Sequence, residues 1–337
     1  MPPSPSRRPA PRRARLVTLA AAALAVAVAA VLVVSGALGA RHDDPWEGAA
    51  PERLTIATGG TSGIYHGYGV AVGDVLTERH GIPVEIAESG GSVENLQRLA
   101  DGSAQVAFSA ADAVADAVAG RGSFDEPVEV SALARVYDDF VHLVVPAGSS
   151  IRSIEDLRGR TVSLGAPGSG TALIAHRLLD VADVPVDRID VRDLDLGRSI
   201  AALGSGDVDA FFWSGGLRTP GLTDLAAETP IRLVPLGDLV EAMRERHGGG
   251  YRHGMVPQGM YGANDEVATL AVPNFLVVPT DMPEPVARTL VATLFDARSQ
   301  VARTVPAAAH LDRARAIFTE PVGLHPGALR YYRETKE

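Results

Sequence analysis

Two glycine-rich segments have the composition of turns that can hold an anion. They are Gly59-Gly-Thr-Ser-Gly-Ile-Tyr65 and Gly165-Ala-Pro-Gly-Ser-Gly-Thr171, and each lies between an apolar run and a helical pattern. Glycine lets backbone N–H groups point into a small space, and the positive end of the following helix attracts a carboxylate. Because Gly and Ser also cap helices, capping alone would explain one such turn. Two equivalent turns favour a ligand that both of them contact.

Several catalytic chemistries lack the residues that they require. The chain has no cysteine and its only lysine is Lys336, which excludes thiolate catalysis, cysteine-ligated metals and catalytic lysines in the folded part. Thr171 stands where a phosphate-binding P-loop has its lysine, and no complete G-x-S-x-G nucleophile motif is present. The nine histidines show no dense metal-binding spacing. The sequence therefore predicts no enzyme, no metal site and no cofactor.

Charge is distributed unevenly along the chain. The first forty residues contain five arginines and no acid, so the formal net charge of −10 leaves −15 on the remainder. An acidic body repels phosphate backbones, and a nucleic acid is therefore not expected as a partner.

The N-terminus has the layout of an export signal. Five arginines precede an apolar run from Leu16 to Val34, and small residues follow, with Ser35 and Ala37 spaced as in a signal-peptidase site. As a helix the run would be roughly 28 Å long, nearly a bilayer core, so a cleaved signal peptide and a retained membrane anchor both stay open. In either case the arginines remain in the cytoplasm and the body is expected to be extracytoplasmic.

From Leu54 onward, short apolar runs alternate with helical patterns, which is typical of an α/β protein with largely parallel strands. Strands are expected at 54–58, 83–87, 105–108 and 161–164. Helices are expected after each glycine-rich turn, at 92–101 with Ser92 as the N-cap, and over 284–301 and 327–333.

The second half repeats landmarks of the first half at a nearly constant offset. Gly59 and Gly165 are 106 positions apart, and Phe108 and Phe211 are 103 positions apart. The repeat predicts two lobes of similar build, joined by the apolar runs 141–145 and 270–278, which would open and close like a hinge on a ligand. The expected segments are 1–40 (signal or anchor), 41–52 (linker), 53–140 (first lobe), 141–270 (second lobe) and 271–337 (return to the first lobe).

Further candidate ligand-binding residues stand mainly near the predicted C-terminal ends of strands, where ligands of open α/β sheets gather. They are Ser92, Asn95, Ser109, Asp112, Arg135 and Trp213. Helix capping is an equally good explanation for Ser92, and core packing is one for Trp213. The Asp and Glu residues offer no pair that the sequence singles out, and most are expected on solvated faces.

Five segments together carry a resemblance to a known family. They are LTIATGGTSGIYHGYG at 54–69, ESGGSVENLQRLADGSAQVAFSAAD at 88–112, IRSIEDLRGRTVSLGAPGSGT at 151–171, GDVDAFFWSGG at 206–216 and GLHPGALRYYRE at 323–334. In this order they resemble the TAXI family of TRAP-associated extracytoplasmic solute receptors, and the resemblance covers nearly everything after the export segment.

The resemblance implies a two-lobed periplasmic-binding-protein fold of the second type. It implies a small organic anion as ligand, such as glutamate or a dicarboxylate, and a sodium-driven TRAP permease as partner. The family's motifs map onto Thr61, Ser62, Tyr65, Ser92, Asn95, Ser109, Asp112, Ser169, Gly170 and Thr171. His66 follows Tyr65 where the family often has a second aromatic residue, and an imidazole at this position would allow the affinity to depend on pH. A membrane-tethered ligand sensor on the same fold is the alternative function.

Overall fold

The computed structural model of the protein describes residues 46, 48–248 and 250–336. The chain divides into two compact units, Met1–Gly48 and Ala49–Glu337, and every helix and strand of the described residues lies in the second unit. The predicted export segment lies outside the described residues. Within the described ranges, no helix combines the length and the apolar composition that crossing a bilayer requires.

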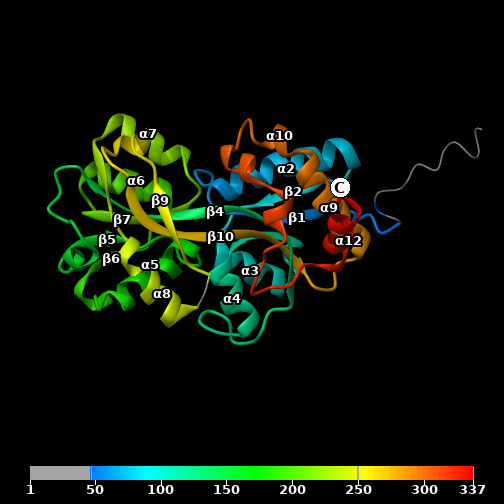
Figure 1. Ribbon diagram of the computed structural model, residues 1–337, viewed down its shortest axis with the longest axis horizontal. Helices are drawn as coiled ribbons and strands as arrows, with labels where there is room; N and C mark the ends of the chain where they lie inside the picture. Colours follow the sequence, from blue (N-terminus) through cyan, green and yellow to red (C-terminus); the bar gives the residue numbers. More distant parts are fainter. Residues whose placement is uncertain (1–45, 47, 249, 337) are drawn as a thin grey trace, which may run out of the picture. The chain divides into compact units, whose positions relative to one another are not determined.

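One mixed β-sheet runs through the second unit, in the strand order β2-β1-β3-β10-β4-β7-β5-β6 (Figure 1). The bounds are β1 Leu54–Ala57, β2 Val84–Ala87, β3 Val106–Ala110, β4 Val130–Pro146, β5 Thr161–Ser163, β6 Asp190–Arg192, β7 Ala210–Gly215 and β10 Val267–Pro279. Two further strands pair at the side, β8 Ile231–Val234 with β4 and β9 Arg252–Val256 with β10.

Each half of the sheet forms one lobe. In the first lobe β1 pairs in parallel with β2 and β3, and in the second lobe β5 pairs in parallel with β6 and β7. The predicted parallel strands are therefore present within each lobe. The pairs that β4 and β10 make are antiparallel, however, so the sheet as a whole is mixed.

The long strands β4 and β10 connect the two lobes (Figure 1). β4 pairs with β10 along its first part and with β7 from Phe140 to Val144, so it passes from the first lobe into the second. β10 returns antiparallel beside it and ends against β3. The apolar runs predicted as connections lie within these strands, and the predicted boundaries 140/141 and 270/271 fall inside them.

Helices cover both faces of the sheet. In the first lobe they are α2 Ile64–His80, α3 Ser92–Ala100, α4 Ala111–Ala119, α9 Glu284–Asp296, α10 Arg298–Val301, α11 Arg313–Ala316 and α12 Pro326–Glu334. In the second lobe they are α5 Gly170–Val181, α6 Leu196–Ser205, α7 Pro220–Glu228 and α8 Val240–His247. Short 3₁₀ turns occupy Ile154–Leu157, Val186–Arg188, Gly237–Leu239, Met260–Gly262 and Pro306–His310.

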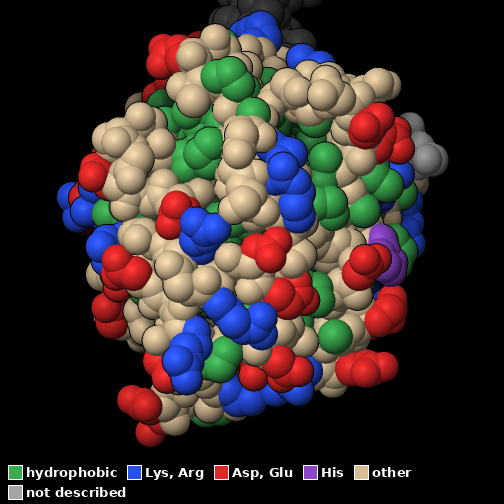
Figure 2. Space-filling model, turned by 90° about the vertical axis from the view of Figure 1, so that its left-hand side faces the viewer, with side chains coloured by type: hydrophobic (Ala, Val, Ile, Leu, Met, Phe, Trp, Pro, Cys, Tyr) green, Lys and Arg blue, Asp and Glu red, His purple; other side chains and the backbone are tan. Residues whose placement is uncertain are grey.

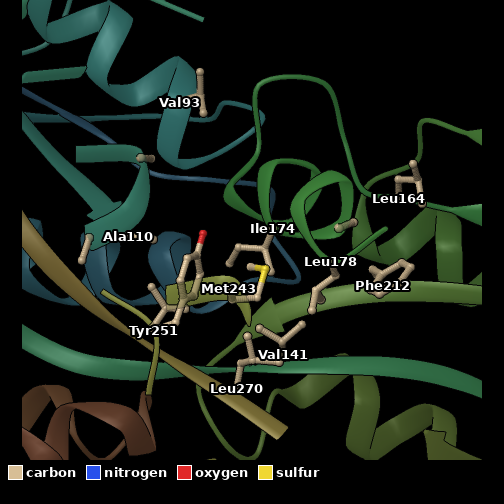
Figure 3. Close-up of a cluster of buried hydrophobic side chains, with 14 of the residues drawn as sticks. Val93, Ala110, Val141, Leu164, Ile174, Leu178, Phe212, Met243, Tyr251 and Leu270 are labelled. Carbon is tan, nitrogen blue, oxygen red and sulfur yellow. The ribbon is translucent and has the colours of Figure 1, made fainter. Parts of the chain in front are cut away.

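A continuous apolar core joins the lobes on the face covered by α3, α4, α5 and α8 (Figures 1 and 3). Val93 of α3 belongs to it, together with Ile174 of α5 and Met243 of α8. Val141 of β4 and Leu270 of β10 form the sheet side of the same cluster (Figure 3). Since burial of each such side chain contributes about 1.5–3 kcal/mol, this core stabilises both lobes together.

The surface of the second lobe mixes both signs of charge. At the end of the molecule that carries β5 and β6, acidic and basic side chains are interspersed (Figure 2). Arg192 forms an ion pair with Asp190, and Arg198 forms one with Asp195 at 2.7 Å.

Two local predictions need correction. The N-cap of α3 is Gly91, whose φ of 130° is a backbone conformation that favours glycine, and Ser92 is the first helical residue. The Ser92 hydroxyl is instead held by the backbone N–H of Ala110, from which it accepts a hydrogen bond of 3.1 Å. The helix predicted over 284–301 is divided at Ala297 into α9 and α10.

Candidate functional site

A cavity of about 80 Å³, partly open to solvent, lies between the lobes, and both glycine-rich turns line it. The first lobe contributes residues from 59–65 and 89–92, and the second contributes residues from 165–171, 194–196 and 212–215. Tyr137 and Asp139 of the connecting strand β4 complete the wall. The turns are more than 100 residues apart in the sequence, and the structure brings them to one cavity, as the predicted repeat requires.

Two helix N-termini lie in the cavity wall. α2 begins after its N-cap Gly63, and α5 begins after Ser169, whose hydroxyl accepts a hydrogen bond of 2.9 Å from the N–H of Ala172. Neither helix has an acidic side chain in its first turn. Because helix N-termini carry partial positive charge, this part of the wall can attract an anionic group.

The N-terminus of α3 contacts the opposite lobe. The backbone N–H groups of Val93 and Glu94 donate hydrogen bonds of 3.1 and 3.0 Å to the carbonyl oxygen of Gly168. Gly168 belongs to the second glycine-rich turn, so these bonds join the lobes across the cleft. The structure therefore has the lobes closed.

Tyr65 and Ser92 form a fixed polar group on the first-lobe side of the cavity. The Tyr65 hydroxyl donates to Oδ1 of Asn274, and it lies 3.1 Å from the Ser92 hydroxyl. The Tyr65 ring stacks on Phe108 with the ring centroids 5.5 Å apart. Burial raises the pKa of the Tyr65 hydroxyl well above its ordinary value, so the side chain stays neutral.

Trp213 closes the cavity from the second lobe. Its indole Nε1 donates a hydrogen bond of 3.0 Å to the hydroxyl of Thr219, which fixes the ring. The ring lies over the backbone of Gly215, where an added Cβ would be only 2.5 Å from the indole nitrogen. Trp213 also approaches Gly63 of the first lobe, so it forms part of the contact between the lobes.

Asp139 is a site residue that the sequence did not single out. It lies in the cavity wall with only 5% of its surface exposed. Its Oδ2 accepts a hydrogen bond of 3.2 Å from the Ser214 hydroxyl, whereas its buried Oδ1 accepts none among the described residues. Burial raises the pKa of this carboxyl to about 7, although the side chains of Asn274 and Ser214 act in the opposite direction.

One signal for Asp139 was present in the sequence. The run 130–146 is apolar except for a few positions, and alternation along a strand turns Tyr137 and Asp139 to the same face. Most acidic residues were expected on solvated faces. Asp139 is an exception because β4 is covered by helices on both faces.

Five predicted site residues do not line the cavity, namely Thr61, Asn95, Ser109, Asp112 and Arg135. Thr61 is exposed beside the first turn. Asn95 is fully buried, and its amide donates hydrogen bonds to the carbonyl oxygens of Thr58 and Phe108 at 2.5 and 2.8 Å. Asn95 therefore stabilises the backbone at the start of the first glycine-rich turn without lining the cavity.

The other three make contacts that account for their positions. The Ser109 hydroxyl donates to the carbonyl oxygen of Ser92 at 3.3 Å. Arg135 forms hydrogen bonds with both carboxyl oxygens of Asp138, each at 2.6 Å. Asp112 accepts a hydrogen bond of 3.0 Å from the buried Tyr251 hydroxyl, which lies outside the cavity wall.

Asp112 belongs to a buried ion network between the lobes. Arg177 of α5 in the second lobe lies 2.5 Å from Asp116 and 3.7 Å from Asp112, and both acids belong to α4 in the first lobe. Arg177 also donates to the Tyr251 hydroxyl at 2.9 Å. Burial raises the pKa of Asp112, and the Arg177 guanidinium opposes that shift.

Three solved proteins illustrate what this chain is similar to. A solved protein of Bordetella bronchiseptica RB50 is 20% identical over 84% of this chain and 89% of that chain, with a TM-score of 0.51. The periplasmic aliphatic sulphonate binding protein SsuA of Escherichia coli is 15% identical over 84% and 79%, with a TM-score of 0.45. The glutamate-bound GluR0 ligand-binding core of Nostoc punctiforme is 15% identical over 76% and 96%, with a TM-score of 0.44.

The predicted fold class is confirmed: the second unit is a two-lobed α/β fold of the periplasmic-binding-protein type, built on a mixed sheet with two connecting strands. A family model described as NMT1-like matches residues 56–335, which is most of the chain. The chain therefore belongs to the NMT1-like family.

Proposed function

We propose that the protein is an extracytoplasmic receptor that captures a small organic solute bearing an anionic group and delivers it to a TRAP-type membrane permease. The observation that carries the proposal is the cavity between the lobes, on which two glycine-rich turns and the N-termini of α2 and α5 converge. The permease follows from the resemblance to TAXI receptors, and the outward location follows from the N-terminal sequence. The protein acts by binding and closure.

The proposed binding residues are the predicted ones that line the cavity, namely Ser62, Tyr65, Ser92, Ser169, Gly170, Thr171 and Trp213. Among the described residues that line the cavity, none is Lys, Arg or His. The anionic group would therefore be bound by backbone N–H groups and hydroxyls, each hydrogen bond contributing about 1.5–3 kcal/mol. The first lobe would comprise residues 53–140 and 271–337, as predicted, and the second lobe residues 141–270. The hinge would lie in β4 and β10.

The test is isothermal titration of the full chain, purified in detergent, with a panel of dicarboxylates, oxo acids and amino acids. The informative variant is Ser169→Asp. Aspartate is as good an N-cap as serine, so α5 is preserved, while a negative charge is added to the cavity wall. We expect the affinity for the best-bound carboxylate to fall at least tenfold because the new charge repels it.

Ser123→Asp is the matched control, since it adds the same charge at an exposed position outside the cavity. It should bind like the unaltered protein. Absence of heat with every member of the panel, or equal binding by the Ser169 variant, would refute the proposal.

A further inference from the structure

The Asp139 carboxyl is incompletely satisfied by the protein itself. Its Oδ2 accepts the Ser214 hydroxyl, and its Oδ1 is buried in the cavity wall without a hydrogen bond among the described residues. The nearby Tyr65 hydroxyl donates to Asn274, and the side chains of Asn274 and Ser214 stabilise the charged carboxyl, but Oδ1 stays without a hydrogen bond from the described part of the chain. A buried carboxylate oxygen without a donor is unfavourable, so a bound solute that supplies one would be preferred.

No protein cation compensates Asp139 within the described cavity wall. The other charged side chain in that wall is Asp195, which caps α6 and pairs with Arg198 at 2.7 Å. Arg135 is engaged with Asp138 and Arg177 with Asp116, and neither lines the cavity. A second anionic group on the solute would meet Asp139 with repulsion, whereas a cationic group would be attracted.

Asp139 is connected through one residue to the place proposed for the anionic group. Ser214 connects the two: its hydroxyl donates to Asp139, and its backbone N–H donates to the Thr171 hydroxyl at 3.1 Å. Thr171 is in the first turn of α5, whose N-terminus lies in the cavity wall. Ser214 therefore links the Asp139 carboxyl, which can accept a hydrogen bond from a cation, to the positively polarised N-terminus of α5.

We propose that Asp139 is a specificity-determining residue that selects solutes with a protonated amine adjacent to a carboxylate, as in α-amino acids, over oxo acids and dicarboxylates that lack the amine. The ammonium group has only donors, so it matches the unpartnered oxygen, while the carboxylate reaches the α5 N-terminus. This inference rests on the proposed receptor function and narrows its ligand class.

The experiment compares solutes that differ only in the amine. L-glutamate is titrated against 2-oxoglutarate, L-leucine against 4-methyl-2-oxopentanoate and L-phenylalanine against phenylpyruvate, with the full chain at pH 8. In the pair with measurable binding, we expect the amino acid to bind at least tenfold more tightly than its oxo acid. Asp139→Asn should lower the affinity for the amino acid at least tenfold and leave that for the oxo acid equal or improved.

Asp138→Asn is the matched control, because it removes the same charge from the neighbouring position of β4, outside the cavity wall. It should keep the preference for the amino acid. If oxo acids or dicarboxylates bind as tightly as amino acids, the inference is wrong and the receptor function stands. If no carboxylate binds at all, the receptor proposal fails and the inference fails with it. Should the Asp139 variant not fold, the paired titrations of the unaltered protein still decide.

Discussion

Among single residues, Asp139 should make solute affinity depend on pH. Its pKa is raised to about 7, mainly by burial, so the carboxyl becomes neutral as pH falls below 7 and can no longer pair with an ammonium group. The titratable side chains that act on Asp139 are Tyr65 and Tyr137, which burial keeps neutral, and the acids Asp112 and Asp138. Amino acid affinity should therefore decrease about tenfold per unit below pH 7.

Titration calorimetry between pH 5.5 and 8.5 checks this expectation. The Asp139→Asn variant should show a flat profile over the same range, because its amide does not ionise. A flat profile in the unaltered protein would show that the carboxyl does not contact the solute.

His142 should make folding stability depend on pH in the acid range. The side chain is 1% exposed on β4, and burial lowers its pKa to about 4. The unfolded chain takes up the proton near pH 6.5, before the folded protein does, so the contribution is complete above pH 6.5 and is lost as pH falls toward 4. The loss from this group should be roughly 2–3 kcal/mol.

Urea unfolding at pH 7.5 and pH 5 measures this loss. His142→Leu, which has a similar volume and no titratable group, should lose less stability between the two values. An equal loss in both proteins would assign the acid sensitivity to other groups.

At the scale of elements, the missing side chain of Gly90, in the turn before α3, leaves the space that the opposite lobe occupies when the lobes close. A Cβ on Gly90 would lie 2.1 Å from the carbonyl oxygen of Pro167 in the other lobe, whereas its φ lies outside the left-handed range. Gly90→Ala is therefore expected to fold normally but to prevent closure. Solute affinity should fall at least tenfold because the contacts from the second lobe are lost.

Small-angle X-ray scattering with and without the bound solute, together with titration calorimetry, tests the Gly90 variant. Gly148→Ala is the control, since a Cβ there meets nothing within 4 Å. Closure and unchanged affinity in the Gly90 variant would contradict the assignment of this contact.

At the scale of the whole molecule, the Arg177 network connects the lobes outside the cavity. Arg177 joins Asp116 and Asp112 of α4 to α5, and all three side chains are at most 12% exposed. Arg177→Met would leave the buried Asp112 without a cation and Asp116 with only the exposed Arg121, which should cost about 3–5 kcal/mol of unfolding free energy. Adding Asp112→Asn and Asp116→Asn to that variant should recover part of the loss, because no buried acidic charge then remains in the network and Arg121 is exposed.

Denaturant unfolding of the three proteins measures this coupling. If the triple variant is no more stable than Arg177→Met, charge compensation is not what the arginine contributes.

The sequence by itself determined the alternation of strands and helices, the two-lobed build and the two glycine-rich turns, because these features follow from local periodicity and from a repeat at a nearly constant offset. Only the tertiary structure decided which polar residues face the cavity. Asp139 receives a hydrogen bond from Ser214, 75 residues away, and Asp112 pairs with Arg177 of the opposite lobe. Burial of a charged side chain depends on such distant contacts, and no local pattern encodes them.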